Sequence, residues 1–168
     1  MQLCIAYCQG EQEALRQKNI RVRVIGSRAE LPGDVNGALN DLERATSGCT
    51  GPTLCLAINY GSRAEIVEAA RSLAEDAASG KLDPAQIDES AFESRLYTAG
   101  LPDPDLLIRT AGEMRISNYL LWQISYAELY VSDLYWPDFD ERALADAIRA
   151  YAGRQRRFGG LQPGSSPA

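Results

Sequence analysis

The sequence contains no histidine among its 168 residues. This absence excludes Ser-His-Asp and Cys-His mechanisms of nucleophilic catalysis, in which an imidazole carries the proton. It also excludes zinc sites of the mixed Cys/His type. Any acid–base or metal chemistry therefore has to come from carboxylates.

Positive charge and long apolar runs are also scarce. The chain has 17 Lys and Arg against 23 Asp and Glu, for a net charge of -6. This balance argues against nucleic-acid binding, which needs a basic surface, but it allows a local basic patch for a small anion. No apolar run approaches the roughly 18 residues that cross a bilayer, and the N-terminus lacks the pattern of a signal peptide. We therefore expect a cytoplasmic protein without a transmembrane segment, built as one domain.

The cysteines offer no metal-binding spacing. Cys4, Cys8, Cys49 and Cys55 form no C-x-x-C pair. We expect these cysteines to be small buried side chains with free thiols, in a protein of a reducing compartment.

The apolar pattern predicts strands that alternate with helices. Strands are expected at 20–24, 53–61 and 105–109, and helices around 35–42, 66–74, 92–96, 118–130 and 144–151. The run TLCLAINYG at 53–61 is continuous enough to indicate a strand covered on both faces. Asp140 is the expected N-cap of the last helix, and the chain from Gly159 is too rich in Gly, Pro and Ser to expect order. The fold class is therefore α/β, with a parallel sheet flanked by helices.

Polar residues follow two of the expected strands. In such folds the ligand lies at the carboxyl ends of the strands, which is where Asn59-Tyr60-Gly61 and Arg109-Thr110 fall. We expect these two segments to meet at one edge of the sheet.

The stretch LIRTAGEMRISN at 107–118 has the residues of an anion site. Arg109 follows a strand, Gly112 permits a left-handed turn, and Arg115 comes next. Ser117 and Asn118 would cap the following helix, whose free N–H groups attract anions. Two guanidinium forks, a hydroxyl and a helix N-terminus would together bind phosphate or diphosphate. The alternative is that the arginines pair with acidic neighbours such as Asp105 or Glu113.

Glu128 is the candidate metal ligand. In a helix over 118–130 it would share a face with Leu120, Leu121 and Ile124. A carboxylate on an apolar face is costly unless it is paired or bound to metal, and Mg²⁺ suits a site next to a diphosphate. The alternative is a glutamate at the edge of the stripe with its head in water.

The longest signal is a resemblance to a known family. The stretch PDLLIRTAGEMRISNYLLWQISYAELYVSDLYWPDFDE, followed by RQRRFGG, closely resembles the C-terminal signature of the cis-prenyltransferases, the undecaprenyl diphosphate synthase family. IRVRVIGSRAELP and TGPTLCLAINYGSRAEIVEAARSLAED are similar to its preceding segments. The resemblance covers residues 19–161.

This resemblance implies an isoprenyl transferase. Enzymes of this family condense isopentenyl diphosphate onto an allylic diphosphate such as farnesyl diphosphate and require Mg²⁺. They are homodimers, and their fold is a parallel sheet ringed by helices. Its product is a polyprenyl diphosphate, which goes on to membrane lipid. The resemblance assigns substrate binding to Asn59, Arg109, Arg115, Ile116, Ser117, Arg157 and Gly159. It assigns Mg²⁺ to Glu128, and Arg157-Phe158-Gly159 would reach toward the partner's active site.

The chain also departs from the family pattern. The family's opening strand ends in Asp-Gly-Asn-Gly-Arg, whose aspartate holds Mg²⁺, and no such motif occurs here, so no catalytic residue is identified. We expect residues 1–18 to be a divergent segment, 19–161 an incomplete cis-prenyltransferase-like domain that lacks the family's N-terminal strand and helix, and 162–168 a flexible tail. The chain would hold the C-terminal two-thirds of such an enzyme, with little or no activity alone. The alternative is a non-catalytic partner subunit of a cis-prenyltransferase dimer.

Overall fold

The computed structural model of the chain describes residues 2–154. The chain divides into two compact units, Met1–Leu101 and Pro102–Ala168. Each unit contains its own parallel sheet of two strands, β1-β2 in the first and β3-β4 in the second. The α/β class with parallel sheets flanked by helices is confirmed. The predicted single sheet is replaced, in the described residues, by two separate pairs.

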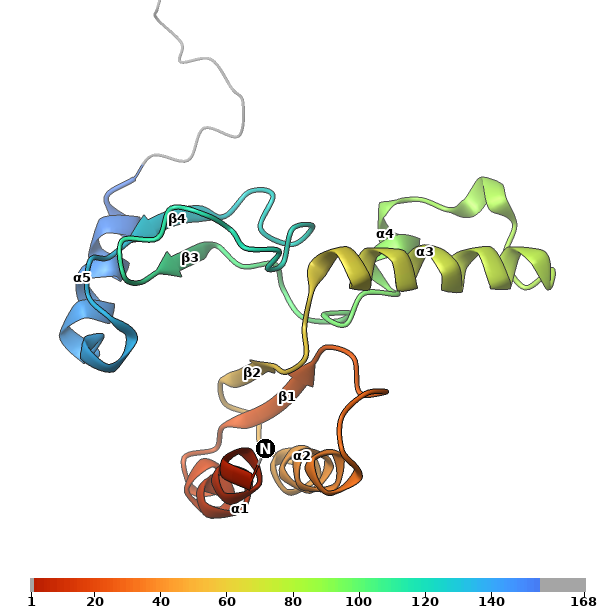
Figure 1. The fold of residues 1–168 in the computed structure, drawn as a ribbon. Coiled ribbons are helices and arrows are strands. Elements are labelled where there is room, and N and C mark those ends of the chain that lie inside the picture. The colour runs from red at the N-terminus through yellow and green to blue at the C-terminus, as the bar shows by residue number, and fades with distance from the viewer. Residues whose placement is uncertain (1, 155–168) are drawn as a thin grey trace, which may run out of the picture. The chain divides into compact units, whose positions relative to one another are not determined.

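Unit 1 places two helices against one face of its sheet (Figure 1). Its main elements are α1 (Gln2–Gln17), β1 (Arg21–Ile25), α2 (Gly33–Thr46), β2 (Thr53–Ala57), α3 (Ser62–Ala78) and α4 (Glu89–Glu93). The core lies between α1, α2 and the strands. Its buried members are Cys8, Val22, Leu31, Val35, Ala38, Leu39 and Leu42. The helical spacing read from the sequence is therefore confirmed in α2.

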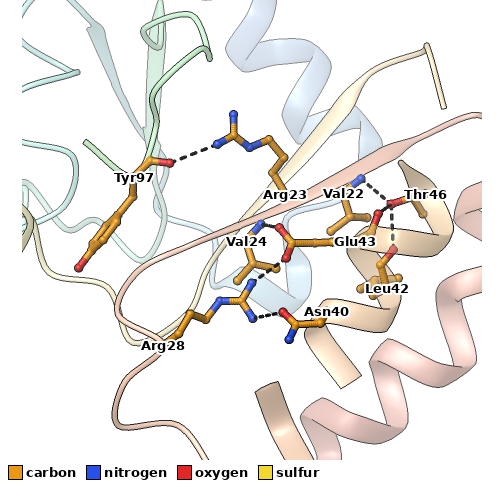
Figure 2. Close-up of polar contacts among 9 residues, drawn as sticks. All are labelled: Val22, Arg23, Val24, Arg28, Asn40, Leu42, Glu43, Thr46 and Tyr97. Carbon is orange, nitrogen blue, oxygen red and sulfur yellow. Dashed lines mark hydrogen bonds and ion pairs between the residues drawn. The ribbon is translucent and has the colours of Figure 1, made fainter. Parts of the chain in front are cut away.

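The outer edge of β1 is closed by side chains of α2 (Figure 2). The hydroxyl of Thr46 accepts the N–H of Val22 at 3.0 Å and donates to the carbonyl of Leu42 at 2.9 Å. The carboxylate of Glu43 accepts the N–H of Val24 at 2.7 Å and pairs with Arg28 at 2.8 Å. On the opposite edge, β1 forms its ladder with β2. The backbone donors of this strand are thus satisfied without a third strand.

β2 is less buried than its sequence predicted. Thr53 and Leu54 are exposed, and Leu54 keeps 41% of its surface. The described helices α1 and α2 cover one face only. On β1, Arg23 bonds instead to the carbonyls of Tyr97 and Ala99 at 3.4 and 3.0 Å. The prediction of a strand covered on both faces is wrong for this part of the chain.

Unit 2 contains β3 (Leu106–Arg109), β4 (Glu128–Val131) and α5 (Glu141–Ala152). The strands pair in parallel, with Leu106 opposite Glu128 and Arg109 opposite Val131. The side chain of Asp140 accepts the N–H of Ala143 at 2.9 Å, so the predicted N-cap of α5 is confirmed.

The predicted helix over 118–130 is wrong. Residues 117–126 form turns, and β4 begins at Glu128. Ser117, Asn118 and Leu120 have φ of 55°, 60° and 48°, which a right-handed helix does not allow. The segment still buries Leu120 and Ile124, so the apolar pattern identified the inward residues but not the backbone that carries them.

Candidate functional site

Arg109 is the last residue of β3, and its backbone is held against β4 and the residue that follows β4. It lies opposite Val131 in the ladder, and its carbonyl accepts the N–H of Ser132 at 2.7 Å. Its side-chain Nε is buried and has no hydrogen-bond partner among the described residues. Buried donors of this kind nearly always have an acceptor. The Nε of Arg109 is therefore a buried donor whose acceptor is not among residues 2–154.

The loop after Arg109 is held against the segment that follows β4. Ala111 donates to the carbonyl of Leu134 at 2.8 Å, and Gly112 donates to that of Ser132 at 2.9 Å. Gly112 has a φ of 65°, so the predicted left-handed turn is confirmed. These bonds fix the backbone of the loop just before Arg115 and Ser117.

Arg115 forms an ion pair with Glu113, which is one of the two partners considered for it. The pair is open, with Arg115 71% exposed. Ile116 and Ser117 are also exposed. No helix begins at Ser117, so the predicted helix N-terminus is not part of this loop. What remains of the predicted anion receptor is two guanidinium groups and one hydroxyl.

Glu128 begins β4 instead of lying on a helix. Its N–H donates to the carbonyl of Asp105 at 2.9 Å, and its carboxylate accepts a hydrogen bond from Arg154 at 2.7 Å. The same guanidinium donates to the carbonyl of Leu129 at 2.9 Å. The carboxylate of Glu128 is thus paired with the guanidinium of Arg154. The alternative interpretation had expected this carboxylate to be solvated by water.

No group of three or more Cys, Asp or Glu side chains within residues 2–154 is arranged to hold a metal ion. One carboxylate alone can still serve Mg²⁺ when phosphate oxygens and water complete the shell. The assignment of Glu128 to Mg²⁺ stays a prediction. Arg157, Gly159 and the tail at 162–168 lie outside the described residues.

Asn59 closes the carboxyl end of the first sheet. It has a φ of 49°, and its side-chain amide donates to the carbonyl of Ser27 at 3.1 Å. Ser27 donates back to the carbonyl of Asn59 at 3.2 Å. Gly26 makes this approach possible, because a Cβ there would lie 2.1 Å from the carbonyl oxygen of Ile58. The ends of β1 and β2 are therefore locked together.

A buried carboxylate supports this strand end, and the sequence reasoning missed it. Glu65 is 1% exposed and accepts the hydroxyl of Tyr60 at 2.5 Å and the N–H of Tyr97 at 2.7 Å. The hydroxyl of Tyr97 donates to Glu68. Burial, followed by this hydrogen bond, raises the pKa of Tyr97 to about 12. The available signal was spacing, since Glu65 shares one stripe of α3 with Ala69 and Leu73.

Each unit also contains an apolar cavity. The cavity of unit 1 has a volume of about 390 Å³ and lies between α1, α2 and β2. The cavity of unit 2 has a volume of about 560 Å³, between β3, the 119–124 turns and the start of α5.

A family model described as "Putative undecaprenyl diphosphate synthase" matches residues 1–159. The chain belongs to this family. The match begins upstream of the resemblance read at 19–161 and takes in α1.

Relatives agree with this family assignment. The chain is 51% identical to an isoprenyl transferase of Geobacter sulfurreducens, over 95% of this chain and 65% of the relative. It is 45% identical to the (2E,6E)-farnesyl-diphosphate specific ditrans,polycis-undecaprenyl-diphosphate synthase of Escherichia coli K12, over 100% of this chain and 66% of the relative.

Solved structures of the family have the same fold. Lavandulyl diphosphate synthase from Lavandula x intermedia, in complex with dimethylallyl diphosphate, has a TM-score of 0.91 and 39% identity, over 95% of this chain and 69% of the other. A "probable undecaprenyl diphosphate synthase" from Campylobacter jejuni has a TM-score of 0.81 and 32% identity, over 94% of this chain and 72% of the other.

The chain spans 60–66% of the length of the curated relatives it matches. The matches themselves cover 90–100% of the chain and do not support the predicted restriction to the C-terminal two-thirds of a family member. Within residues 2–154, no helix combines the length and apolar character needed to cross a bilayer.

Proposed function

We propose that this chain binds isopentenyl diphosphate and serves its cis-condensation onto an allylic diphosphate, such as farnesyl diphosphate. The observation that carries the proposal is Arg109, whose buried Nε at the end of β3 has no acceptor among the described residues. A diphosphate oxygen is a suitable acceptor, because a guanidinium fork matches its geometry and charge. The names of the relatives, an undecaprenyl-diphosphate synthase and a lavandulyl diphosphate synthase, support prenyl diphosphates as the substrate class.

Other residues would bind the diphosphate together with Arg109. Arg115 would exchange its open pair with Glu113 for the diphosphate, at little cost because that pair is solvated. Ile116 and Ser117 would contact the same group. Asn59, Arg157 and Gly159 would complete the substrate site, as the family resemblance assigns them.

The proposal extends to Mg²⁺, with Glu128 as its ligand from this chain. When bound, Mg²⁺ would neutralise the charge that develops on the diphosphate. Glu128 would have to leave Arg154 for this role, so Arg154 holds the carboxylate in place until then. A single carboxylate fits a site that phosphate oxygens and water complete.

We also propose a cytoplasmic homodimer. Unit 2 leaves large apolar side chains exposed, including Trp136 at 74% and Ile148 at 51%, which is typical of surfaces that bury against a partner. The free thiols Cys4, Cys8, Cys49 and Cys55 suit a reducing compartment.

Binding of labelled isopentenyl diphosphate to the 168-residue chain tests the substrate assignment. Arg109→Ala should weaken binding by about 10- to 100-fold, since a charged hydrogen bond contributes about 1.5–3 kcal/mol. Arg115→Ala should have a smaller effect, because Arg115 is exposed and gives up an existing pair. Arg149→Ala, which removes an exposed arginine paired with Asp146, is the matched control. Binding to Arg109→Ala at wild-type strength would overturn the proposal.

A separate assay addresses turnover. With farnesyl diphosphate, labelled isopentenyl diphosphate and Mg²⁺, these 168 residues alone should give little or no polyprenyl product, because the family's Asp-Gly-Asn-Gly-Arg motif does not occur among them. Robust product formation would contradict this expectation.

A further inference from the structure

Two thiols of α1 face the same apolar cavity. Cys4 and Cys8 are one helical turn apart, and both line the cavity of about 390 Å³ in unit 1. Cys8 is only 6% exposed, whereas Cys4 is half-buried. The other walls of the cavity are mainly leucine and isoleucine. The apolar ones are Leu15, Leu39, Leu42, Leu54, Leu56 and Ile58, and Tyr7 and Glu11 of α1 complete the lining.

The helix holds these thiols too far apart for a disulfide but suitably for a bridge of one atom. Side chains four residues apart on a helix have Cβ atoms about 5–6 Å from each other. A disulfide needs about 3.5–4.5 Å between its Cβ atoms, so α1 would have to unwind to form one. A thiophilic atom between the two sulfurs adds two bonds of about 2.3 Å and spans the wider gap.

We propose that Cys4 and Cys8 form a two-thiol site for a soft, thiophilic ligand with an apolar substituent, of the class of trivalent organoarsenicals. In the reaction with phenylarsine oxide, two S–H bonds and the arsenic–oxygen bond break. Two arsenic–sulfur bonds form, and the oxygen leaves with both thiol protons as water. No electron is exchanged with an outside reagent. The phenyl group then occupies the cavity, where the leucine side chains remove it from water.

The remaining cysteines do not offer this arrangement. Cys49 lies 4.0 Å from the carbonyl of Arg16, and Cys55 lies on β2. Burial, together with the neighbouring Cys4, raises the pKa of the Cys8 thiol. Cys8 is therefore a poor target for oxidants and alkylating reagents, which act on thiolates. Bidentate capture distinguishes the pair from a single reactive cysteine.

The test uses the complete, reduced chain with phenylarsine oxide and native mass spectrometry. One phenylarsenic group per chain should bind, with the loss of one water, and 2,3-dimercaptopropanol should remove it while a monothiol at the same thiol concentration does not. Cys4→Ser and Cys8→Ser should each abolish the adduct, whereas Cys49→Ser and Cys55→Ser should keep it. Far-UV circular dichroism shows whether each variant folds, and the half-buried Cys4 gives a decisive variant even if Cys8→Ser does not fold.

A second comparison tests the role of the cavity. Phenylarsine oxide should bind at least 10-fold more tightly than arsenite, which has no aryl group. Equal affinity would overturn the assignment of the aryl group to the cavity. An adduct that persists in folded Cys4→Ser, or that disappears in Cys49→Ser or Cys55→Ser, would overturn the two-thiol site itself.

Discussion

Nη1 of Arg154 lies 2.7 Å from Oε2 of Glu128, so the chain just after the end of α5 is tied to the first residue of β4. The same nitrogen also reaches the carbonyl of Leu129. One side chain therefore fixes the helix end against two consecutive strand residues.

Arg154→Ala should lower the free energy of unfolding by about 1 kcal/mol. Both partners are partly exposed, which reduces the benefit of the pair, but the bond to the Leu129 carbonyl is lost as well. Urea denaturation gives the measurement. Arg149→Ala, whose pair with Asp146 is more exposed, should change stability by less than about 0.5 kcal/mol. Equal changes in unfolding free energy for the two variants would show that the bonds of Arg154 stabilise the fold no more than an exposed ion pair does.

Thr46→Val should destabilise unit 1 by about 1–3 kcal/mol at nearly constant volume. The substitution leaves the buried N–H of Val22 without an acceptor. Ser47→Ala is the control, because the hydroxyl of Ser47 is exposed and bonds only to the carbonyl of Arg44. The control should cost less than about 0.5 kcal/mol. A neutral result for Thr46→Val in urea denaturation would mean that the edge of β1 needs no cap from α2.

Two glycines of unit 1 should respond to alanine in opposite directions. Gly26→Ala should cost about 2–4 kcal/mol, because φ is +114° and the new Cβ meets the carbonyl oxygen of Ile58. Gly37→Ala should stabilise by about 0.5–1 kcal/mol, since Gly37 lies inside α2 with no atom within 4 Å of the new Cβ. Thermal and urea unfolding measure both changes. Stabilisation by Gly26→Ala would contradict the locked strand ends.

Tyr97 should make stability fall at high pH. Its pKa is raised from 10.0 to about 12, by burial first and by its bond to Glu68 second. The unfolded chain therefore releases this proton at a lower pH than the folded chain. The contribution of Tyr97 is fully present below about pH 10 and is lost as the pH rises through about 12.

Tyr97→Phe should flatten the decline of unfolding free energy between these pH values and remove one late step from the tyrosinate absorbance titration. Tyr135→Phe, which changes an exposed ring, is the control and should leave that step in place. Persistence of the late step in Tyr97→Phe would assign it to another residue.

Local signals in the sequence predicted the elements whose formation depends on local chemistry. The apolar spacing of α2, the cap at Asp140 and the turn at Gly112 all follow from residues within a few positions of each other. The segment 117–126 escaped because its apolar spacing suits a helix, whereas the structure needs left-handed residues at Ser117 and Asn118. The segment leads into β4, whose pairing with β3 joins residues about 22 positions apart and is not visible in a local periodicity.

The residues of the proposed anion site could be named from the sequence, but the contacts around the candidate residues could not. The position of Arg109 at a strand end followed from the apolar run before it. The choice of Arg154 as partner of Glu128 did not, because the two residues are 26 positions apart and meet only through packing of α5 on β4. The supporting contact of Glu65 with Tyr97 spans 32 positions and was hidden for the same reason.

The side chains of Thr46 and Glu43 block one edge of the first sheet. With the N–H groups of Val22 and Val24 already bonded to α2, β1 offers no free donors there to an incoming strand. Any strand that joins this sheet has to do so alongside β2. A helix thus decides on which side the sheet can grow, and the β1 edge is protected from pairing with the strands of other molecules.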